Sequence, residues 1–166
     1  MKCSICGDDH RLVELELTFK RPDVVASLSA EERSERCKES ADLARLDHAR
    51  WFVRGTIPFP VSGRKRKYRI GAWAEVDKNT LERILEHWED EQQDSHPPLP
   101  ARLANEVPGH RDSCGQRALL QLVGPETRPE ILIPDTDTSL GAEQASGISE
   151  DQAVQYSSYI FHGNRG

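Results

Sequence analysis

Alternation of apolar and polar residues predicts β-strands along much of the chain. Residues 13–19 place apolar side chains at odd positions and polar ones between them, as in a strand with one buried face. Four later stretches rich in β-branched and aromatic residues are also predicted strands: 51–61, 68–76, 117–123 and 130–133. The second and third strands flank the polar loop 62–67 and therefore form a hairpin.

Helical periodicity and capping signals predict the helices. Ser29 with Glu32 three residues later is a capping box that begins a polar surface helix through about Lys38. A second such pair, Ser149 with Gln152, begins a last helix toward Phe161. The best-defined helix follows Asp77, and its apolar stripe is predicted to be buried across the sheet: Leu81, Ile84, Leu85 and Trp88.

Glycine and proline positions predict irregularities in this scheme. Gly55 is expected to mark a bulge, and Pro58 and Pro60 place the far end of their strand at an edge or outside the ladder. Residues 47–50 are expected to form a turn, and prolines begin a long irregular loop over 97–115.

The order of these elements predicts an α+β fold. We expect a mainly antiparallel sheet of about five or six strands, two or three packed helices, and an N-terminal CxxC hook. The predicted organisation is a hook segment over residues 1–11 followed by a single α+β domain over 12–166.

The hook carries the most specific chemistry. Cys3 and Cys6 are separated by two residues and followed by Gly7, and two thiolates at that spacing can bind one zinc ion at about 2.3 Å. His10 is a candidate third ligand. The predicted metal ligands are therefore Cys3, Cys6 and His10.

A closed zinc site needs a fourth ligand, and the sequence leaves two completions open. One uses Cys37, and the other uses His110 and Cys114 in the long loop. The alternative is a pair of free thiols. A thioredoxin-like redox pair is disfavoured, because no strand precedes Cys3.

Charge and composition narrow the function further. The net charge of −6 disfavours binding to nucleic acid and suits a basic protein partner. No apolar run is long enough for a bilayer span, and the first residues do not form a secretory signal. We therefore expect a cytoplasmic protein with reduced cysteines and no membrane association.

The remaining candidate residues have simpler structural explanations. Residues 64–67 form a basic run that is more typical of a solvated hairpin tip than of a nucleic-acid contact. Asp47 and His48 could support acid–base chemistry, and Glu75 and Asp77 flank a strand end, but no nucleophile is paired with them by spacing. Trp51, Trp73 and Trp88 are expected in the core, and no phosphate loop, GxSxG elbow or dinucleotide fingerprint is present.

Several segments together resemble an uncharacterised bacterial family, domain of unknown function 2199. The matching segments run in order along nearly the whole chain: 3–10, 19–23, 52–55, 71–76, 102–109 and 143–148. The resemblance implies a bacterial protein but no assigned activity.

Three positions depart from the pattern of this family. Its members carry a cysteine at the position of Ala44, a tyrosine at that of His110 and an aliphatic residue at that of Cys114. The first departure removes a possible fourth ligand. The other two make the His110–Cys114 completion specific to this chain.

Two functions remain. The first is a non-enzymatic binding or regulatory module that presents the aromatic hairpin and the 97–115 loop to a protein partner. The alternative is a small hydrolase-type enzyme with its site under the 97–115 loop, using Asp47, His48 or the hook metal.

Overall fold

A long antiparallel hairpin forms the centre of the protein. The structure, a computed structural model, describes the backbone of residues 15–162 and the side chains of residues 15–160. Strands β3 (Arg50–Phe59) and β4 (Tyr68–Val76) pair continuously from Trp51↔Val76 to Phe59↔Tyr68. The hairpin predicted from the sequence is confirmed.

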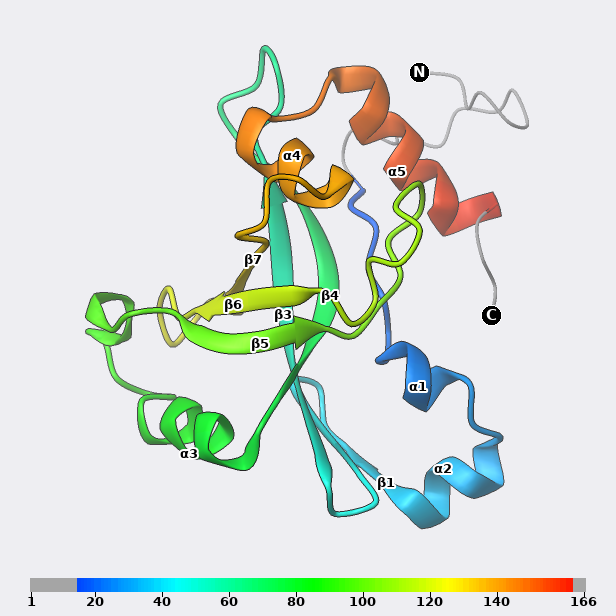
Figure 1. The fold of residues 1–166 in the computed structure, drawn as a ribbon, viewed down its shortest axis with the longest axis vertical. Helices are drawn as coiled ribbons and strands as arrows, with labels where there is room; N and C mark the ends of the chain where they lie inside the picture. Colours follow the sequence, from blue (N-terminus) through cyan, green and yellow to red (C-terminus); the bar gives the residue numbers. More distant parts are fainter. Residues whose placement is uncertain (1–14, 163–166) are drawn as a thin grey trace.

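Three further strands close this hairpin into a five-stranded barrel. They are β5 (Leu99–Leu103), β6 (Arg117–Gln121) and β7 (Glu130–Leu132), each antiparallel to the strand before it in the order β4-β5-β6-β7. The last strand, β7, pairs in parallel with β3 at Thr56↔Glu130. That single pairing joins the two ends of the sheet and closes the barrel (Figure 1).

Two more strands extend the sheet beyond the barrel. β2 (Leu43–Leu46) pairs with the first half of β3, and β1 (Cys37–Glu39) pairs with β2. β2 and β7 thus share one edge of β3. Along this edge, Arg54 donates its N–H to the carbonyl of Asp42, and Thr56 donates its N–H to the carbonyl of Pro129. β2 and β7 diverge from β3 at this point.

The helices surround the sheet on several sides. Near one end of the barrel lie α4 (Ser139–Ser146) and α5 (Glu150–His162), and near the other lies α3 (Lys78–Glu86) (Figure 1). α1 (Asp23–Ala26) and α2 (Ala30–Arg36) lie beside the extension of the sheet. Between residues 15 and 162, no helix combines the length and apolar character needed to cross a membrane.

The capping signals of the sequence are all found in the structure. Ser29 and Glu32 form a reciprocal capping box at α2, and Asp77 accepts from the N–H of Thr80 at α3. Ser149 and Gln152 make the same reciprocal bonds before α5. Such caps satisfy N–H groups that have no partner within the helix.

The buried stripe of α3 is narrower than predicted. Ile84 is fully buried, and Leu81 and Trp88 pack partly against the core, but Leu85 is 47% exposed. Adjacent helical residues are about 100° apart, so burying Ile84 at the centre of the contact rotates Leu85 to the solvent side.

Two groups of buried side chains form the core. The larger fills the barrel and includes Ile57, Ile70, Leu120 and Ile131. The smaller lies under α1 at the extension of the sheet: Val25, Ala44, Leu46, Phe52, Trp73 and Ala104. The predicted burial of Trp73 is confirmed, whereas Trp51 and Trp88 are only half-buried.

The fold is a mixed helix-and-strand arrangement, as predicted, but has more elements than the sequence indicated. Between residues 15 and 162 it has seven strands and five α-helices, plus a short 3₁₀ helix, η2 (Gln93–Ser95). β1, β2, α1 and α4 were not predicted. β5 occupies part of the predicted irregular 97–115 loop, because pairing with β6 accommodates Pro100 opposite Leu119.

Three local predictions are corrected. Of the strand predicted over 13–19, the described part makes only one bridge, from Thr18 to Gly71. Gly55 is not a bulge, since the register runs unbroken past it. Pro58 remains in the ladder opposite Arg69, and its missing N–H falls on the side of β3 away from β4.

Gly55 is instead required by the closure of the barrel. A β-carbon at this position would lie 2.7 Å from the carbonyl oxygen of Pro129 and 3.1 Å from Cγ1 of Ile131. We expect Gly55→Ala to destabilise the protein by about 1–3 kcal/mol, because backbone of β7 must move away from β3. Urea unfolding measures this, and an unchanged midpoint would show that β7 is not held against β3.

Candidate functional site

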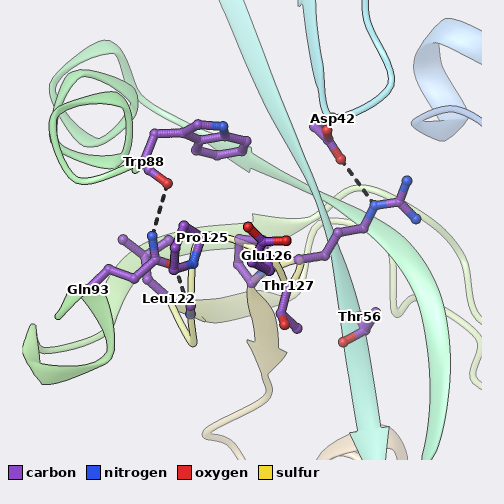
Figure 2. A pocket seen from close by; sticks show the side chains of 11 residues that line it. Asp42, Thr56, Trp88, Gln93, Leu122, Pro125, Glu126 and Thr127 are labelled. Atoms are coloured by element: carbon purple, nitrogen blue, oxygen red, sulfur yellow. Dashed lines mark hydrogen bonds and ion pairs between the residues drawn. The ribbon is translucent and has the colours of Figure 1, made fainter. Parts of the chain in front are cut away.

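A cleft of about 510 Å³ opens where β2 and β7 diverge from β3. Side chains from four separate parts of the chain surround it (Figure 2). It is lined by Asp42, Thr56, Trp88, Gln93, Leu122, Gly124, Pro125, Glu126, Thr127, Arg128 and Pro129. The volume lies within the range of about 300–1,000 Å³ typical of ligand pockets.

The buried amide of Gln93 holds two walls of the cleft together. Its Nε2 donates to the carbonyl oxygens of His87 and Trp88, at 2.9 and 3.1 Å. Its Oε1 accepts from the N–H of Gly124 at 2.9 Å. Gln93 is 3% exposed, and these three bonds are partly buried. The segment after α3 is therefore fixed against the loop between β6 and β7.

The loop between β6 and β7 forms the second wall. Gly124 has φ 143°, which side-chain-bearing residues rarely adopt, and its carbonyl accepts from the N–H of Thr127 at 3.1 Å. The carbonyl of Pro129 then accepts from Thr56 on β3. Both ends of the loop are attached to the barrel, so Glu126 is presented at the cleft by a fixed turn.

The charges of the cleft are unevenly paired. Nε of Arg128 donates to Oδ1 of Asp42 at 3.1 Å, with both side chains 41% exposed. The Glu126 carboxylate lies between Trp88 and Asp42 in Figure 2. Within residues 15–160, no basic side chain forms an ion pair with it. Of the two carboxylates that line the cleft, Asp42 is thus paired with Arg128, whereas Glu126 forms no ion pair within the described residues.

A second guanidinium lies close to the Asp42–Arg128 pair. Arg54 donates to the carbonyls of Ala41 and Phe19 and lies 5.5 Å from the ring centre of Trp73. Burial and the positive charge of Arg128 lower the pKa of Arg54, and the Asp42 carboxylate opposes this. Arg54 therefore adds a second positive charge beside the Asp42–Arg128 ion pair.

The chemistry of the lining favours recognition over reaction. The eleven residues contain no cysteine, histidine or serine, and one of the two carboxylates is engaged by Arg128. The indole of Trp88 offers an aromatic face, and Leu122 and Pro125 add apolar surface. A cleft of this composition can hold a ligand that has both an apolar and a charged part.

A family model for "Uncharacterized protein conserved in bacteria (DUF2199)" matches residues 2–148. The chain belongs to this family. The family resemblance predicted from the sequence is thereby confirmed, and the match includes every residue that lines the cleft. Comparison with curated proteins and with solved structures finds no match.

The hook residues lie outside the described part of the chain. Cys3, Cys6 and His10 all fall within residues 1–14, so the predicted zinc site stays a prediction. The other candidate residues from the sequence lie in the described part, and most of them have structural partners.

The predicted acid–base residues serve turns, caps and ion pairs. Asp47 and His48 have φ of 54° and 55° in the predicted turn between β2 and β3, and both are exposed. Asp47 pairs with Arg36, and the hydrogen bonds from this guanidinium hold the pKa of Asp47 below its usual range. Asp77 caps α3. These ion pairs and caps account for where the carboxylates lie, so a catalytic role is not needed to explain them.

Other charged candidates are also engaged. Glu75 accepts two hydrogen bonds from Arg50, and Arg64 of the basic run pairs with Glu150 at the start of α5. The Arg64 pair joins the hairpin tip to the last helix. At least one residue of the basic run, Arg64, therefore has a structural role.

The structure disfavours His110 and Cys114 as the completion of a zinc site. Both ring nitrogens of His110 are already hydrogen-bonded. Burial, with the nearby carboxylates of Asp23 and Glu106, raises the pKa of the Cys114 thiol to about 11. A thiol in that environment stays protonated at neutral pH and is a poor ligand.

His110 is the centre of a polar network that joins the 104–116 loop to α4 and α5. Its Nδ1 lies 2.6 Å from Oγ of Ser139, and its Nε2 lies 2.5 Å from Oε2 of Glu143 and 2.7 Å from the hydroxyl of Tyr156. Tyr156 donates to Oε1 of Glu143 at 2.8 Å. An N–H on Nε2 satisfies every member, with the Ser139 hydroxyl donating to Nδ1.

The network changes the acid–base properties of two of its members. Burial opposes ionisation of Glu143, but hydrogen bonds from His110 and Tyr156 outweigh it and hold the pKa of Glu143 below its usual range. Burial, together with the charge of Glu143, raises the pKa of Tyr156. Glu143 is thus ionised at neutral pH.

Sequence reasoning missed Gln93 and most residues of the cleft. Gln93 lies in a polar stretch, and its burial depends on the loop that it contacts 31 positions later. The segment that holds Gly124 and Glu126 followed from the sequence only as the connection between the strands predicted over 117–123 and 130–133. The two sides of the cleft meet only in the folded chain.

The lowered pKa of Glu143 predicts a pH dependence of stability. A carboxyl whose pKa is lower in the folded state stabilises the protein above its unfolded pKa, and this contribution is lost as pH falls through the folded value. We expect Glu143→Gln to lose less stability than the wild type between about pH 5 and about pH 3. Urea unfolding at each pH measures this, with the exposed Glu82→Gln as control; equal slopes in all three proteins would contradict it.

The raised pKa of Cys114 predicts slow alkylation of the folded protein. At pH 8 we expect iodoacetamide to modify Cys114 about 100-fold more slowly in the native state than in urea, because the reactive thiolate is scarce. Mass spectrometry of the peptide that contains Cys114 measures both rates. Similar rates in the two states would show that its surroundings do not suppress ionisation.

Proposed function

We propose that this protein is a non-enzymatic binding module whose cleft holds a lysine or arginine side chain of a protein partner. The observation that carries the proposal is the placement of two groups on opposite walls of one cleft: the Trp88 indole and the Glu126 carboxylate, which has no ion-pair partner within residues 15–160 (Figure 2). A long basic side chain has an apolar stem and a cationic head. It therefore matches both of these groups at once.

The free energies expected from these interactions can be stated. A cation over an indole face contributes about 0.5–2 kcal/mol, depending on how far the site is desolvated. The Glu126 carboxylate, which forms no ion pair within residues 15–160, adds a charge-assisted hydrogen bond to the cationic head. The net charge of −6 would attract basic partners over a longer range.

The rigidity of the walls supports this proposal. Gln93 and the turn at Gly124 fix Trp88 and Glu126 before any partner binds. A preorganised site loses less conformational entropy on binding, so more of the interaction energy becomes affinity. The cleft volume of about 510 Å³ exceeds one side chain and would admit a short segment of the partner.

The N-terminal hook forms a separate part of the proposal. We propose that Cys3, Cys6 and His10 bind zinc and that residues 1–11 form a metal-bound segment attached to the domain of residues 12–166. The thiolates that zinc requires persist in a reducing compartment, so this assignment goes with a cytoplasmic location.

Binding of short basic peptides tests the cleft. We expect an arginine-containing peptide to change tryptophan fluorescence, and the same peptide with neutral citrulline to bind at least about tenfold more weakly, a difference of about 1.4 kcal/mol. Trp88→Ala and Glu126→Gln should each weaken binding by a similar factor. The matched control is Glu82→Gln, which removes an exposed charge of α3 outside the cleft. Equal binding of the two peptides, or equal effects of Glu126→Gln and Glu82→Gln, would refute the proposal.

The second candidate function is the hydrolase-type enzyme with its site at the 97–115 loop. It is favoured by the row Ser139–His110–Glu143, in which an exposed hydroxyl, a buried imidazole and a carboxylate are joined by hydrogen bonds. A cavity of about 480 Å³ adjoins Ser139 and His110. In this hypothesis Ser139, His110 and Glu143 take the catalytic role that the sequence suggested for Asp47 and His48.

Two features make this candidate the weaker one. The imidazole binds the serine through Nδ1 and the carboxylate through Nε2, the reverse of the common serine–histidine–acid order. Tyr156, which shares the carboxylate, lies on α5 beyond the residues matched by the family model. The row is also fully explained as a contact between α4, α5 and the loop.

Labelling with a fluorophosphonate tests the enzyme hypothesis. If Ser139 is an activated nucleophile, the reagent should modify it, and Ser139→Ala should abolish the labelling while leaving the urea midpoint near that of the wild type. Ser146→Ala, which alters an exposed serine of the same helix, is the control. No labelling of Ser139 would remove this candidate.

A further inference from the structure

Three potential metal ligands gather in the segment that follows α3. One ring nitrogen of His87, one of His96 and a carboxylate oxygen of Asp90 all lie within 4.8 Å of one another. All three side chains are half-buried, with exposures of 28%, 39% and 36%. This cluster is unrelated to the N-terminal hook and does not line the cleft.

The separations of the ligand atoms match a zinc-sized ion. Oδ2 of Asp90 lies 3.4 Å from Nε2 of His96 and 3.8 Å from Nδ1 of His87. Ligands at about 2.0–2.2 Å from a tetrahedral ion are about 3.3–3.5 Å apart. Side-chain movements of a few tenths of an ångström would therefore bring these two pairs to coordination distance.

The backbone holds the three ligands in place without a metal. Oδ1 of Asp90 accepts from the N–H of Gln92 at 2.9 Å, which directs Oδ2 toward the two imidazoles. The carbonyl of His87 accepts from the N–H of Asp90, and the carbonyl of His96 accepts from Nε2 of Gln121. The site is thus preorganised by bonds that do not involve the ligand atoms.

The two imidazoles are stacked on each other. The ring centres of His87 and His96 are 3.9 Å apart, with 25° between the ring planes. Because the lone pair of each ring nitrogen lies in its ring plane, one ring must rotate out of this stack before both nitrogens can point at one ion. The side chains are 28% and 39% exposed, which leaves room for that rotation.

We propose that His87, Asp90 and His96 form a binding site for a divalent transition-metal ion, with zinc as the best match. Two imidazoles and one carboxylate are ligands that zinc favours, and the imidazoles disfavour magnesium and calcium. Three protein ligands leave a fourth position for water or for a group of a partner. No reaction is assigned to this ion.

The same segment carries one wall of the cleft, so the two sites are linked. Trp88 directly follows His87, and Gln93 lies between Asp90 and His96 in the chain. A metal that joins both ends of the segment would restrict the motion of Trp88. We therefore expect occupancy by zinc to tighten binding at the cleft, a part of the proposal that rests on the proposed function.

Metal binding is tested first by itself. The protein is the full chain without a histidine tag, carrying Cys3→Ser and Cys6→Ser so that the hook cannot supply thiolates. Isothermal titration with zinc alone should show one ion per chain. His96→Ala should weaken the affinity at least about 100-fold, while His48→Ala, which removes an exposed histidine of a turn, should leave it unchanged. Equal affinities of these two variants would overturn the site.

Cobalt provides a second measurement that does not depend on stability. Bound to the double-serine protein, cobalt should give visible absorption bands of nitrogen and oxygen ligation without a thiolate charge-transfer band. Asp90→Asn should alter these bands, and circular dichroism verifies that each variant is folded. No bands at a saturating cobalt concentration would overturn the metal site even if His96→Ala proved unstable.

The link to the cleft has a separate readout. In the same background, zinc should increase the affinity for the arginine-containing peptide, and this increase should vanish in His96→Ala. Zinc binding without any change in peptide affinity would refute the link and leave the metal site standing. Failure of the peptide to bind at all would refute the proposed function and not the metal site.

Discussion

The structure depends on the way one edge of β3 is divided between two partners. β2 pairs with its first half and β7 with Thr56, and the change of partner occurs at Gly55, the one residue between Arg54 and Thr56. Gly55 makes this possible, because any side chain there would meet the carbonyl of Pro129. The parallel pairing closes the barrel, and the divergence of the two partners leaves the cleft.

The position of the cleft explains its charges and its rigidity. Asp42 directly precedes β2 and Arg128 lies just before β7, on either side of the divergence, so their ion pair spans the gap between the two strands. Gln93 supplies the opposing constraint by bonding to both walls from a buried position. The metal site that we propose acts on the same wall, through the residues on either side of Gln93.

Local sequence patterns predict much of the architecture, and the segments that they fail to predict depend on contacts with distant parts of the chain. The hairpin, the caps of α2, α3 and α5, and the strands at 117–123 and 130–133 were predicted because their signals lie within a few residues. β5 was missed because Pro98 and Pro100 suggest irregular chain until β6 pairs with it. Leu85 was misplaced because periodicity gives the width of a stripe but not the rotation of the helix against its neighbour.

The sequence by itself determined the class of fold, the family and the acidic charge, since composition, periodicity and capping act over short distances. It also identified the cysteine pair at residues 3 and 6, but no fourth ligand. Only the tertiary structure placed Trp88 opposite Glu126, and Gln93 beneath both walls. It also gave His110 two hydrogen-bonded nitrogens and Cys114 a raised pKa. Those facts depend on contacts between segments far apart in the chain, which no local pattern encodes.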